Sequence, residues 1–205
     1  MNTLAKLGAM SCLMAFSAGA AAAVPPQLPG YAAPTPAADA SEGIVRVSAA
    51  EQSFTAYITG YSYWDNTPPG SAAIARPVIH RKAGGKGTYA DPITIAVGYR
   101  LVGSKARLDF PAGTRFYLPH LRRYAIVEDI CGDGPNPDVT GCARGNNGHP
   151  WLDIYVDGSR VGAEAANACM YRLTGFHQIV MNPAKGYPVA AGPIAESGCS
   201  TSPSR

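Results

Sequence analysis

Residues 111–156 hold the three segments that decide the fold: PAGTRFYLP (111–119), YAIVEDICGDG (124–134) and WLDIYV (151–156). Side chains in these segments alternate with a period of two, and β-branched and aromatic residues are frequent, which is typical of β-strands. Each segment also brings a polar residue to a strand boundary. A small barrel made of such strands would gather polar side chains in a cleft, so the segments predict an all-β fold.

Two aspartates stand out in these segments. Asp129 lies where the second segment breaks into residues rich in Gly and Pro (132–137), and Asp153 lies between Leu152 and Ile154 inside the third. A carboxylate with such apolar neighbours either faces solvent from its strand or lies in a partly apolar pocket, where its pKa would rise. The residues alone leave both interpretations open.

The body of the chain predicts one domain built of short strands. Residues 53–191, about 140 residues, are enough for a single core. One helix is predicted at Val161–Tyr171, with Ser159 as its N-cap and Gly175 just beyond its end. The strands are predicted at Phe54–Thr59, Ile93–Val97, Thr114–Leu118, Tyr124–Asp129, Leu152–Val156 and Gln178–Met181.

The two ends of the chain predict export and a loose tail. Residues 1–23 carry one charge, Lys6, before an apolar run that ends in three alanines, and they are interpreted as a signal peptide. Residues 24–52 are rich in Pro and Ala and are predicted to be a linker. Residues 192–205 are polar and are expected to be loose apart from Cys199. We therefore expect a secreted or periplasmic protein without a membrane anchor.

The cysteines of the exported chain predict disulfides. Cys131, Cys142, Cys169 and Cys199 remain after export, and an even number of cysteines outside the cytosol favours a disulfide framework. Three pairings are possible: a Cys131–Cys142 bond would close a short loop, and a Cys169–Cys199 bond would tie the tail to the body. A zinc site is the weaker interpretation, because no C-x₂-C pair occurs and the four histidines lack metal-ligand spacing. No metal or other cofactor is expected.

Aromatic residues gather near the start of the predicted domain. Tyr61, Tyr63 and Trp64 follow the first predicted strand, and Tyr89 precedes the second. Such a cluster belongs either to the core or to a platform on which sugar rings stack, since Tyr and Trp are amphipathic. Trp151 lies two residues before Asp153 and is a further candidate for contact with a substrate.

The order of these segments resembles a known superfamily. TGYSYWDN, TYADPITIAV and FPAGTRFYLP, followed by YAIVEDICGDG and WLDIYV, are similar to the double-psi β-barrels, which include expansins, barwin-like proteins, rare lipoprotein A, the family 45 endoglucanases and the three-aspartate domain of lytic transglycosylases. The resemblance covers Phe54 to Met181. It implies a six-stranded double-psi β-barrel with one short helix and disulfide-tied loops.

The resemblance also implies roles for three carboxylates. Asp153 matches the aspartate of the H-F-D pattern in expansins and endoglucanases, the proton donor there, with Trp151 in place of the histidine. Asp129 matches the aspartate of the A-E-D pattern in the three-aspartate domain. The first aspartate of that domain would fall near Gly98 and is missing from this chain. Asp65 in SYWDN is similar to the aspartate of the Y-W-D pattern in family 45 endoglucanases, a general base.

These matches imply a protein that binds or cleaves cell-wall polysaccharide, in the manner of expansins or lytic transglycosylases, with Asp153 as general acid. The expected partner is peptidoglycan or a plant-type glycan, and the expected state is a monomer. Nucleic acid is not expected, because the net charge of +3 falls to about +2 once Lys6 is removed. The alternative is a barwin-like protease inhibitor or effector that binds a partner protein without catalysis. An open groove with Asp153 at its floor would favour the first, and a protruding loop over a closed groove the second.

Overall fold

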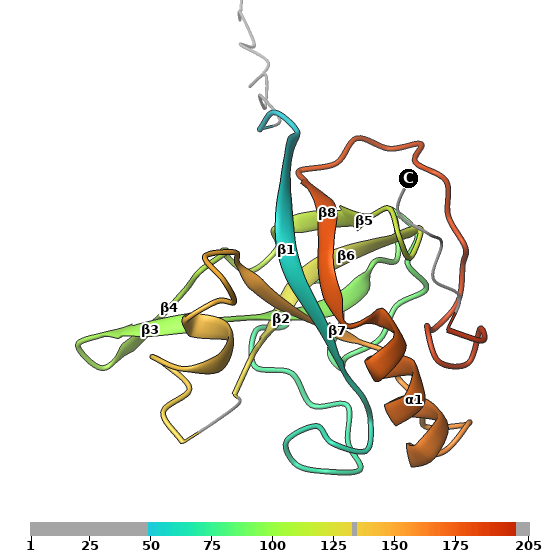
Figure 1. Cartoon of the computed structure of the whole chain (residues 1–205), viewed down its shortest axis with the longest axis horizontal. Helices are drawn as coiled ribbons and strands as arrows, with labels where there is room; N and C mark the ends of the chain where they lie inside the picture. The colour runs from blue at the N-terminus through green and yellow to red at the C-terminus, as the bar shows by residue number, and fades with distance from the viewer. Residues whose placement is uncertain (1–48, 133–134, 200–205) are drawn as a thin grey trace, which may run out of the picture. The chain divides into compact units, whose positions relative to one another are not determined.

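The computed structural model describes residues 49–132 and 135–199, and Figure 1 shows their arrangement. The predicted signal peptide and all but the last residues of the predicted linker lie outside the described residues. Within this part, no helix is long and apolar enough to cross a membrane. The elements are β1 (Gln52–Tyr61), β2 (Ile93–Val97), β3 (Tyr99–Val102), β4 (Lys105–Leu108), β5 (Arg115–Leu118), β6 (Arg123–Ile130), the 3₁₀ turn η1 (Gly141–Ala143), β7 (Trp151–Tyr155), α1 (Ala163–Leu173) and β8 (Gly175–Met181).

Six of the strands close a barrel in the order β1-β7-β2-β6-β5-β8. β1 pairs in parallel with β7, as β2 does with β6, and the other neighbours are antiparallel. Exchanging β1, β2 and β5 for β6, β7 and β8 reproduces the same neighbours and directions, so the barrel consists of two topologically equivalent halves. The predicted fold class, an all-β six-stranded barrel with one short helix and disulfide-tied loops, is confirmed.

The core lies inside the barrel and follows from the alternation of the strands. Ile58 of β1, Ile95 of β2 and Val127 of β6 are fully buried, as are Leu152 and Ile154 of β7. Each buried aliphatic side chain contributes about 1.5–3 kcal/mol to folding through removal of its surface from water. The residues that alternate with them along each strand point away from the interior, and the polar side chains of the strands lie on that outer face.

The structure differs from the prediction at a hairpin and at the helix. β3 and β4 form a separate two-stranded hairpin that extends away from the barrel in Figure 1. It was not predicted, because its exposed strands lack an apolar face. α1 begins at Ala163, two residues later than expected, and its N-cap is Gly162 rather than Ser159. Gly162 has a φ of 92°, a conformation that glycine adopts without strain.

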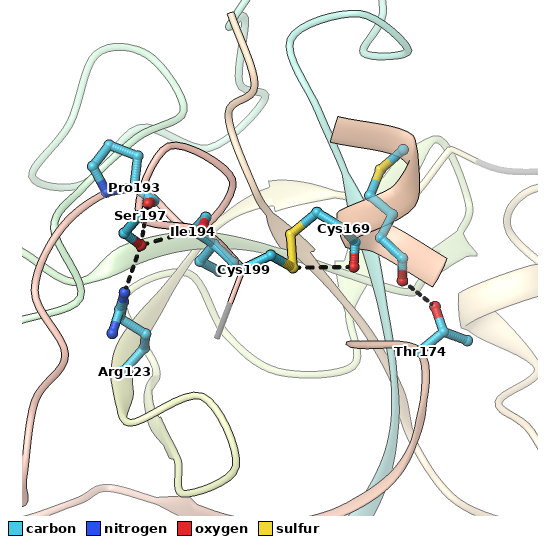
Figure 2. Close-up of a disulfide and its surroundings, with 8 residues drawn as sticks. Arg123, Cys169, Thr174, Pro193, Ile194, Ser197 and Cys199 are labelled. Carbon is cyan, nitrogen blue, oxygen red and sulfur yellow. Dashed lines mark hydrogen bonds between the residues drawn. A yellow bond between two sulfur atoms is a disulfide. The ribbon is translucent and has the colours of Figure 1, made fainter. Parts of the chain in front are cut away.

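The C-terminal segment is packed, so the prediction of a loose tail is wrong for residues 193–199. Ile194 and Ala195 are buried, and the Ala195 N–H donates to the Val156 carbonyl at 3.0 Å. Arg123 donates to the Ser197 hydroxyl at 3.0 Å, as Figure 2 shows. Two apolar side chains in an otherwise polar segment are enough to anchor it beside a disulfide.

Both disulfides join cysteines of the described part. Cys169 of α1 pairs with Cys199 of the C-terminal segment. Cys131, just after β6, pairs with Cys142 of η1 and closes the intervening loop. The expectation that the four cysteines form disulfides is confirmed, and the structure selects one of the three possible pairings.

Candidate functional site

Two of the candidate aspartates lie in one row across the barrel wall. Thr59 on β1, Asp153 on β7, Ala96 on β2 and Asp129 on β6 are successive register partners. Residues paired in this way project to the same face of a sheet. Their sequence neighbours on β1 and β7 fill the core. The row therefore faces outward, with two carboxylates separated by the small side chain of one alanine.

A β-bulge places Asp129 in this row. Ile95 pairs with Val127, but the next residue, Ala96, pairs with Asp129 and passes over Glu128. In an unbroken ladder Glu128 would stand opposite Ala96. Bulges commonly redirect side chains beside functional sites. Here the extra residue brings Asp129 into the same row as Asp153.

Two hollows meet beside the row. The larger, about 410 Å³, is lined by Asp129, Asp153 and Asp65, together with residues of the loop 66–75. The smaller, about 310 Å³, is lined by Asp153, Asp65 and Trp151 and by residues of α1. Tyr61, Asp65 and Asp153 line both. The hollows thus form one groove in which all three predicted carboxylates meet.

A directional chain of hydrogen bonds ends on Asp153. The Trp151 indole N–H donates to the Thr59 hydroxyl oxygen at 2.7 Å, and that hydroxyl donates to Asp153 Oδ1 at 2.6 Å. Because the indole nitrogen is only a donor, the Thr59 hydroxyl must turn its own proton toward Asp153. Asp153 is 7% exposed. Its Oδ1 therefore accepts a hydrogen bond whose direction is fixed by the neighbouring indole.

Asp129 holds the wall of the larger hollow. Its Oδ1 accepts the backbone N–H groups of Ala75 and Ile130, both at 2.9 Å. Its Oδ2 accepts the Tyr61 hydroxyl at 3.0 Å. Burial raises the pKa of Asp129, and these hydrogen bonds oppose the rise without cancelling it. Asp129 therefore positions Tyr61 and the loop at Ala75.

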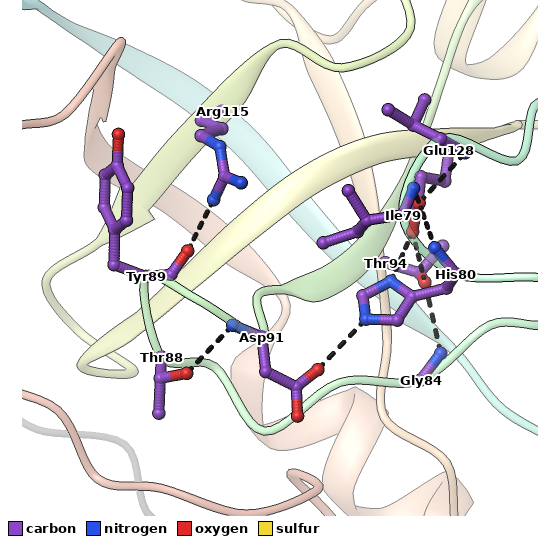
Figure 3. Close-up of polar contacts among 10 residues, drawn as sticks. Ile79, His80, Gly84, Thr88, Tyr89, Asp91, Thr94, Arg115 and Glu128 are labelled. Atoms are coloured by element: carbon purple, nitrogen blue, oxygen red, sulfur yellow. Dashed lines mark hydrogen bonds and ion pairs between the residues drawn. The ribbon is translucent and has the colours of Figure 1, made fainter.

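Glu128 binds a later part of the connection between β1 and β2. Its Oε1 accepts the backbone N–H groups of Val78, Ile79 and His80 at 2.7–3.1 Å, and its Oε2 lies 2.6 Å from His80 Nδ1. The other ring nitrogen of His80 lies 3.0 Å from Asp91, as Figure 3 shows. Two carboxylates around one imidazole favour its doubly protonated form.

The pKa values of this network follow from those contacts. Burial disfavours the charged form of His80, but the hydrogen bonds to Glu128 and Asp91 outweigh it and raise the His80 pKa. Burial also opposes ionisation of Glu128, but hydrogen bonds from the backbone and ring of His80 outweigh it and lower the Glu128 pKa. No role is predicted for Glu128 from the sequence alone. The resemblance of the V-E-D pattern concerns only its aspartate, and the position of Glu128 depends on the β-bulge, which the sequence does not indicate.

Asp65 is the exposed carboxylate of the groove. Its Oδ1 accepts both the backbone N–H and the hydroxyl of Ser62 at 2.7 Å. Its Oδ2 has no hydrogen bond within residues 49–132 and 135–199. The local turn therefore fixes Asp65 while one of its oxygens stays available to water or to a ligand.

The predicted aromatic residues divide into two groups. Tyr61 and Trp151 line the groove. Tyr63 packs edge-to-face on Trp64, whose indole donates to the Gly158 carbonyl at 2.9 Å. Neither of them lines the groove, and neither does Tyr89, which packs on Tyr124 of β6. Sequence reasoning also missed Tyr171 of α1, which is 77% exposed and lines the smaller hollow.

No group of three or more metal-ligating side chains is found in the described ranges. His80 belongs to the network above. His120 and His177 stack on each other with ring centroids 3.6 Å apart.

Comparison with known proteins gives one family and one relative. Residues 53–201 match the family described as the DDB_G0273701 N-terminal domain. An uncharacterized protein of Dictyostelium discoideum is 33% identical over 142 residues, which cover 69% of this chain and 56% of the relative. The match thus spans little more than half of that longer protein. No solved structure matches the chain.

Proposed function

We propose that this chain, which belongs to the DDB_G0273701 N-terminal domain family, is a secreted protein that binds and cleaves cell-wall polysaccharide in the groove centred on Asp153. One observation carries the proposal. Asp153 lies where the two hollows of the groove meet, together with Tyr61 and Asp65. A polymer lying along the groove would pass over this carboxylate and extend to both sides of it.

The chemistry of glycoside cleavage fits the groups at this junction. The reaction needs an acid beside the leaving oxygen and, in an inverting hydrolase, a second carboxylate roughly 6.5 to 9.5 Å away that activates water. Asp153 is the candidate acid. Asp65 is the candidate base, because one of its oxygens stays available and it lines both hollows. Without a base, attack by a hydroxyl of the sugar itself remains a one-carboxylate route.

The walls of the groove suit sugar rings. Tyr61 and Trp151 offer aromatic surface at the two hollows, and Tyr171 adds an exposed ring from α1. Aromatic faces stack on the apolar faces of sugars, while their polar atoms stay hydrogen-bonded. The two equivalent halves of the barrel agree with the double-psi resemblance that motivates this function. Fold alone does not decide function, so the proposed function depends on the residues of the groove.

Product analysis tests the proposal. The mature protein is incubated with purified peptidoglycan and, separately, with cellulose, and soluble products are identified by mass. We expect release from one substrate and a loss on the order of 10²-fold in Asp153→Asn, which keeps the shape and removes the proton. Glu164→Gln, an exposed change in the first turn of α1, is the matched control and keeps full release. Release that survives in a folded Asp153→Asn variant would refute the acid role.

The β3–β4 hairpin favours the second candidate, an inhibitor or effector. The hairpin protrudes from the barrel, and Leu101 and Val102 at its tip are 54% and 61% exposed. Exposed aliphatic residues on a protruding loop are suited to a pocket in a partner protein. Inhibition of secreted proteases by wild type, lost in Leu101→Ser/Val102→Ser, together with no glycan release, would establish this function instead.

A further inference from the structure

Two cations share the ring of Tyr89, away from the groove. The guanidinium carbon of Arg115 lies 4.7 Å from the ring centroid, and the ammonium of Lys185 lies 5.3 Å from it. Arg115 also donates to the Tyr89 backbone carbonyl at 2.6 Å, as Figure 3 shows. Each cation is attracted to the negative face of a tyrosine ring. The ring thus holds two like charges near each other.

Further cations extend this surface. Exposed Lys86 and Arg122 are joined by the segment that follows Lys185, because Gly192 N–H donates to the Lys86 carbonyl and Ala190 N–H donates to the Arg122 carbonyl. We call Lys86, Arg115, Arg122 and Lys185 the basic face. Within the described part of the chain, none of the four has a carboxylate within ion-pair distance.

Glu51, a carboxylate that contacts the loop carrying Lys185, is engaged by other groups of that loop. Glu51 accepts the Ala184 backbone N–H and the Tyr187 hydroxyl. It therefore satisfies polar groups of the loop and forms no ion pair with Lys185. Positive charge on the basic face stays uncompensated, and the repulsion between its members would be relieved by a bound anion.

We propose that the basic face binds an acidic polysaccharide through its carboxylate or sulfate groups. Arg115 offers a planar fork that matches such oxyanions, and Lys185 adds a mobile charge on the same ring. Four separated cations suit a polymer with sparse charge. Nucleic acid carries one charge per 1.7 Å of duplex and calls for a denser basic surface than a chain of net charge +3 provides.

The choice of a polysaccharide as the ligand rests on the proposed glycan function. Binding of an anionic polymer at the basic face does not depend on catalysis in the groove. Tyr89 is predicted to belong either to the core or to a platform for sugar rings, and its position outside the groove gives it a different role. It holds the two cations in place. A polysaccharide retained at the basic face would raise the local concentration of its neutral or cleavable portions at the groove.

Binding to polygalacturonate, a carboxylated polysaccharide, tests the inference, with neutral dextran and single-stranded DNA as comparison probes. At low salt we expect wild type to bind polygalacturonate and not dextran. Lys185→Gln should weaken binding several-fold, and Arg115→Gln/Lys185→Gln about tenfold or more, with a shallower salt dependence. The exposed single variant guards against a fold defect in the double variant, and melting temperature is recorded for each.

Lys105→Gln/Arg107→Gln on the β3–β4 hairpin is the matched control, because it removes the same charge from exposed positions elsewhere. We expect it to bind within about twofold of wild type. Equal weakening in the control would show a net-charge effect, and tighter binding to DNA than to polygalacturonate would identify the wrong polymer; either result overturns the proposal. Polygalacturonate binding is tested on the basic-face variants and glycan release on Asp153→Asn, so failure of the catalytic proposal is distinguishable from failure of this one.

Discussion

The hydroxyl of Thr59 donates a hydrogen bond of 2.6 Å to Asp153 Oδ1 across the parallel pairing of β1 and β7. The two residues are direct register partners, so the barrel backbone fixes their separation. The Trp151 indole sets the direction of the bond by occupying the Thr59 oxygen as an acceptor. The orientation of the candidate acid is therefore set by two side chains that need not touch the reacting bond.

Removing the Thr59 hydroxyl should change the pH profile of glycan release. A donor to a carboxylate stabilises its charged form. In Thr59→Val, Asp153 should keep its proton to higher pH, so release persists further into the alkaline range than in wild type. Thr59→Ser retains the hydroxyl and should restore the wild-type profile. Initial rates of release from pH 4 to 9 measure this, and identical profiles in all three proteins would remove Thr59 from the mechanism.

His80 should make stability fall as pH rises. Its pKa is raised above 6.5 in the folded state, so the stabilisation is complete below the unfolded value and is lost as pH passes the folded value. Glu128 has a lowered pKa, so its contribution is present above about 4.5 and is lost as pH falls through the folded value. We expect the ionised pair of His80 and Glu128 to stabilise the fold most at pH values between about 4.5 and 6.5. Denaturation of wild type and His80→Gln at pH 5.5 and 8.5 should show a difference that shrinks at the higher pH.

The stacked pair of His120 and His177 should act in the opposite direction. His120 is 3% exposed, neither of its ring nitrogens has a partner within the described residues, and burial lowers its pKa to about 3. The unfolded chain binds the proton first, so stability falls as pH drops below 6.5, by up to about 1.4 kcal/mol per pH unit for one site. His120→Phe should flatten this fall. Urea denaturation at pH 4.5 and 7 measures it, and an unchanged slope would contradict the assignment.

Replacing each of the two tryptophans with alanine should show whether polysaccharide binds in the groove. Trp151 lines the smaller hollow and Trp64 does not. Trp151→Ala should reduce retention on insoluble wall polysaccharide, because it removes stacking surface and the donor to Thr59. Trp64 is 40% exposed and packs on Tyr63, so Trp64→Ala should leave retention unchanged. Co-sedimentation with the polysaccharide provides the comparison, and equal losses would mean that the groove is not the binding surface.

Sequence patterns predict the barrel strands, which depend on local alternation of side chains. They do not predict contacts that depend on pairing between strands far apart in the sequence. All six barrel strands were predicted within a few residues, because each has its own apolar face. The row from Thr59 to Asp129 could not be predicted, since it depends on register between strands far apart in sequence and on a bulge at Glu128. His80 likewise gave no signal, because its two carboxylate partners lie 11 and 48 residues away.

Asp65 and Asp129 should respond differently to the same change, and the difference identifies the reaction. Asp65 keeps one oxygen available, whereas both oxygens of Asp129 accept hydrogen bonds that hold Tyr61 and the loop at Ala75. Asp65→Asn should leave the melting temperature nearly unchanged. In an inverting hydrolase it should lower glycan release on the order of 10²-fold, as Asp153→Asn does, and little loss would favour the one-carboxylate route or binding alone.

Asp129→Asn should instead lower stability by about 1–3 kcal/mol, because its amide cannot accept all three donors. Thermal denaturation and product release on the three variants decide the matter, and an Asp129→Asn protein of wild-type stability that has lost release would move the base from Asp65 to Asp129.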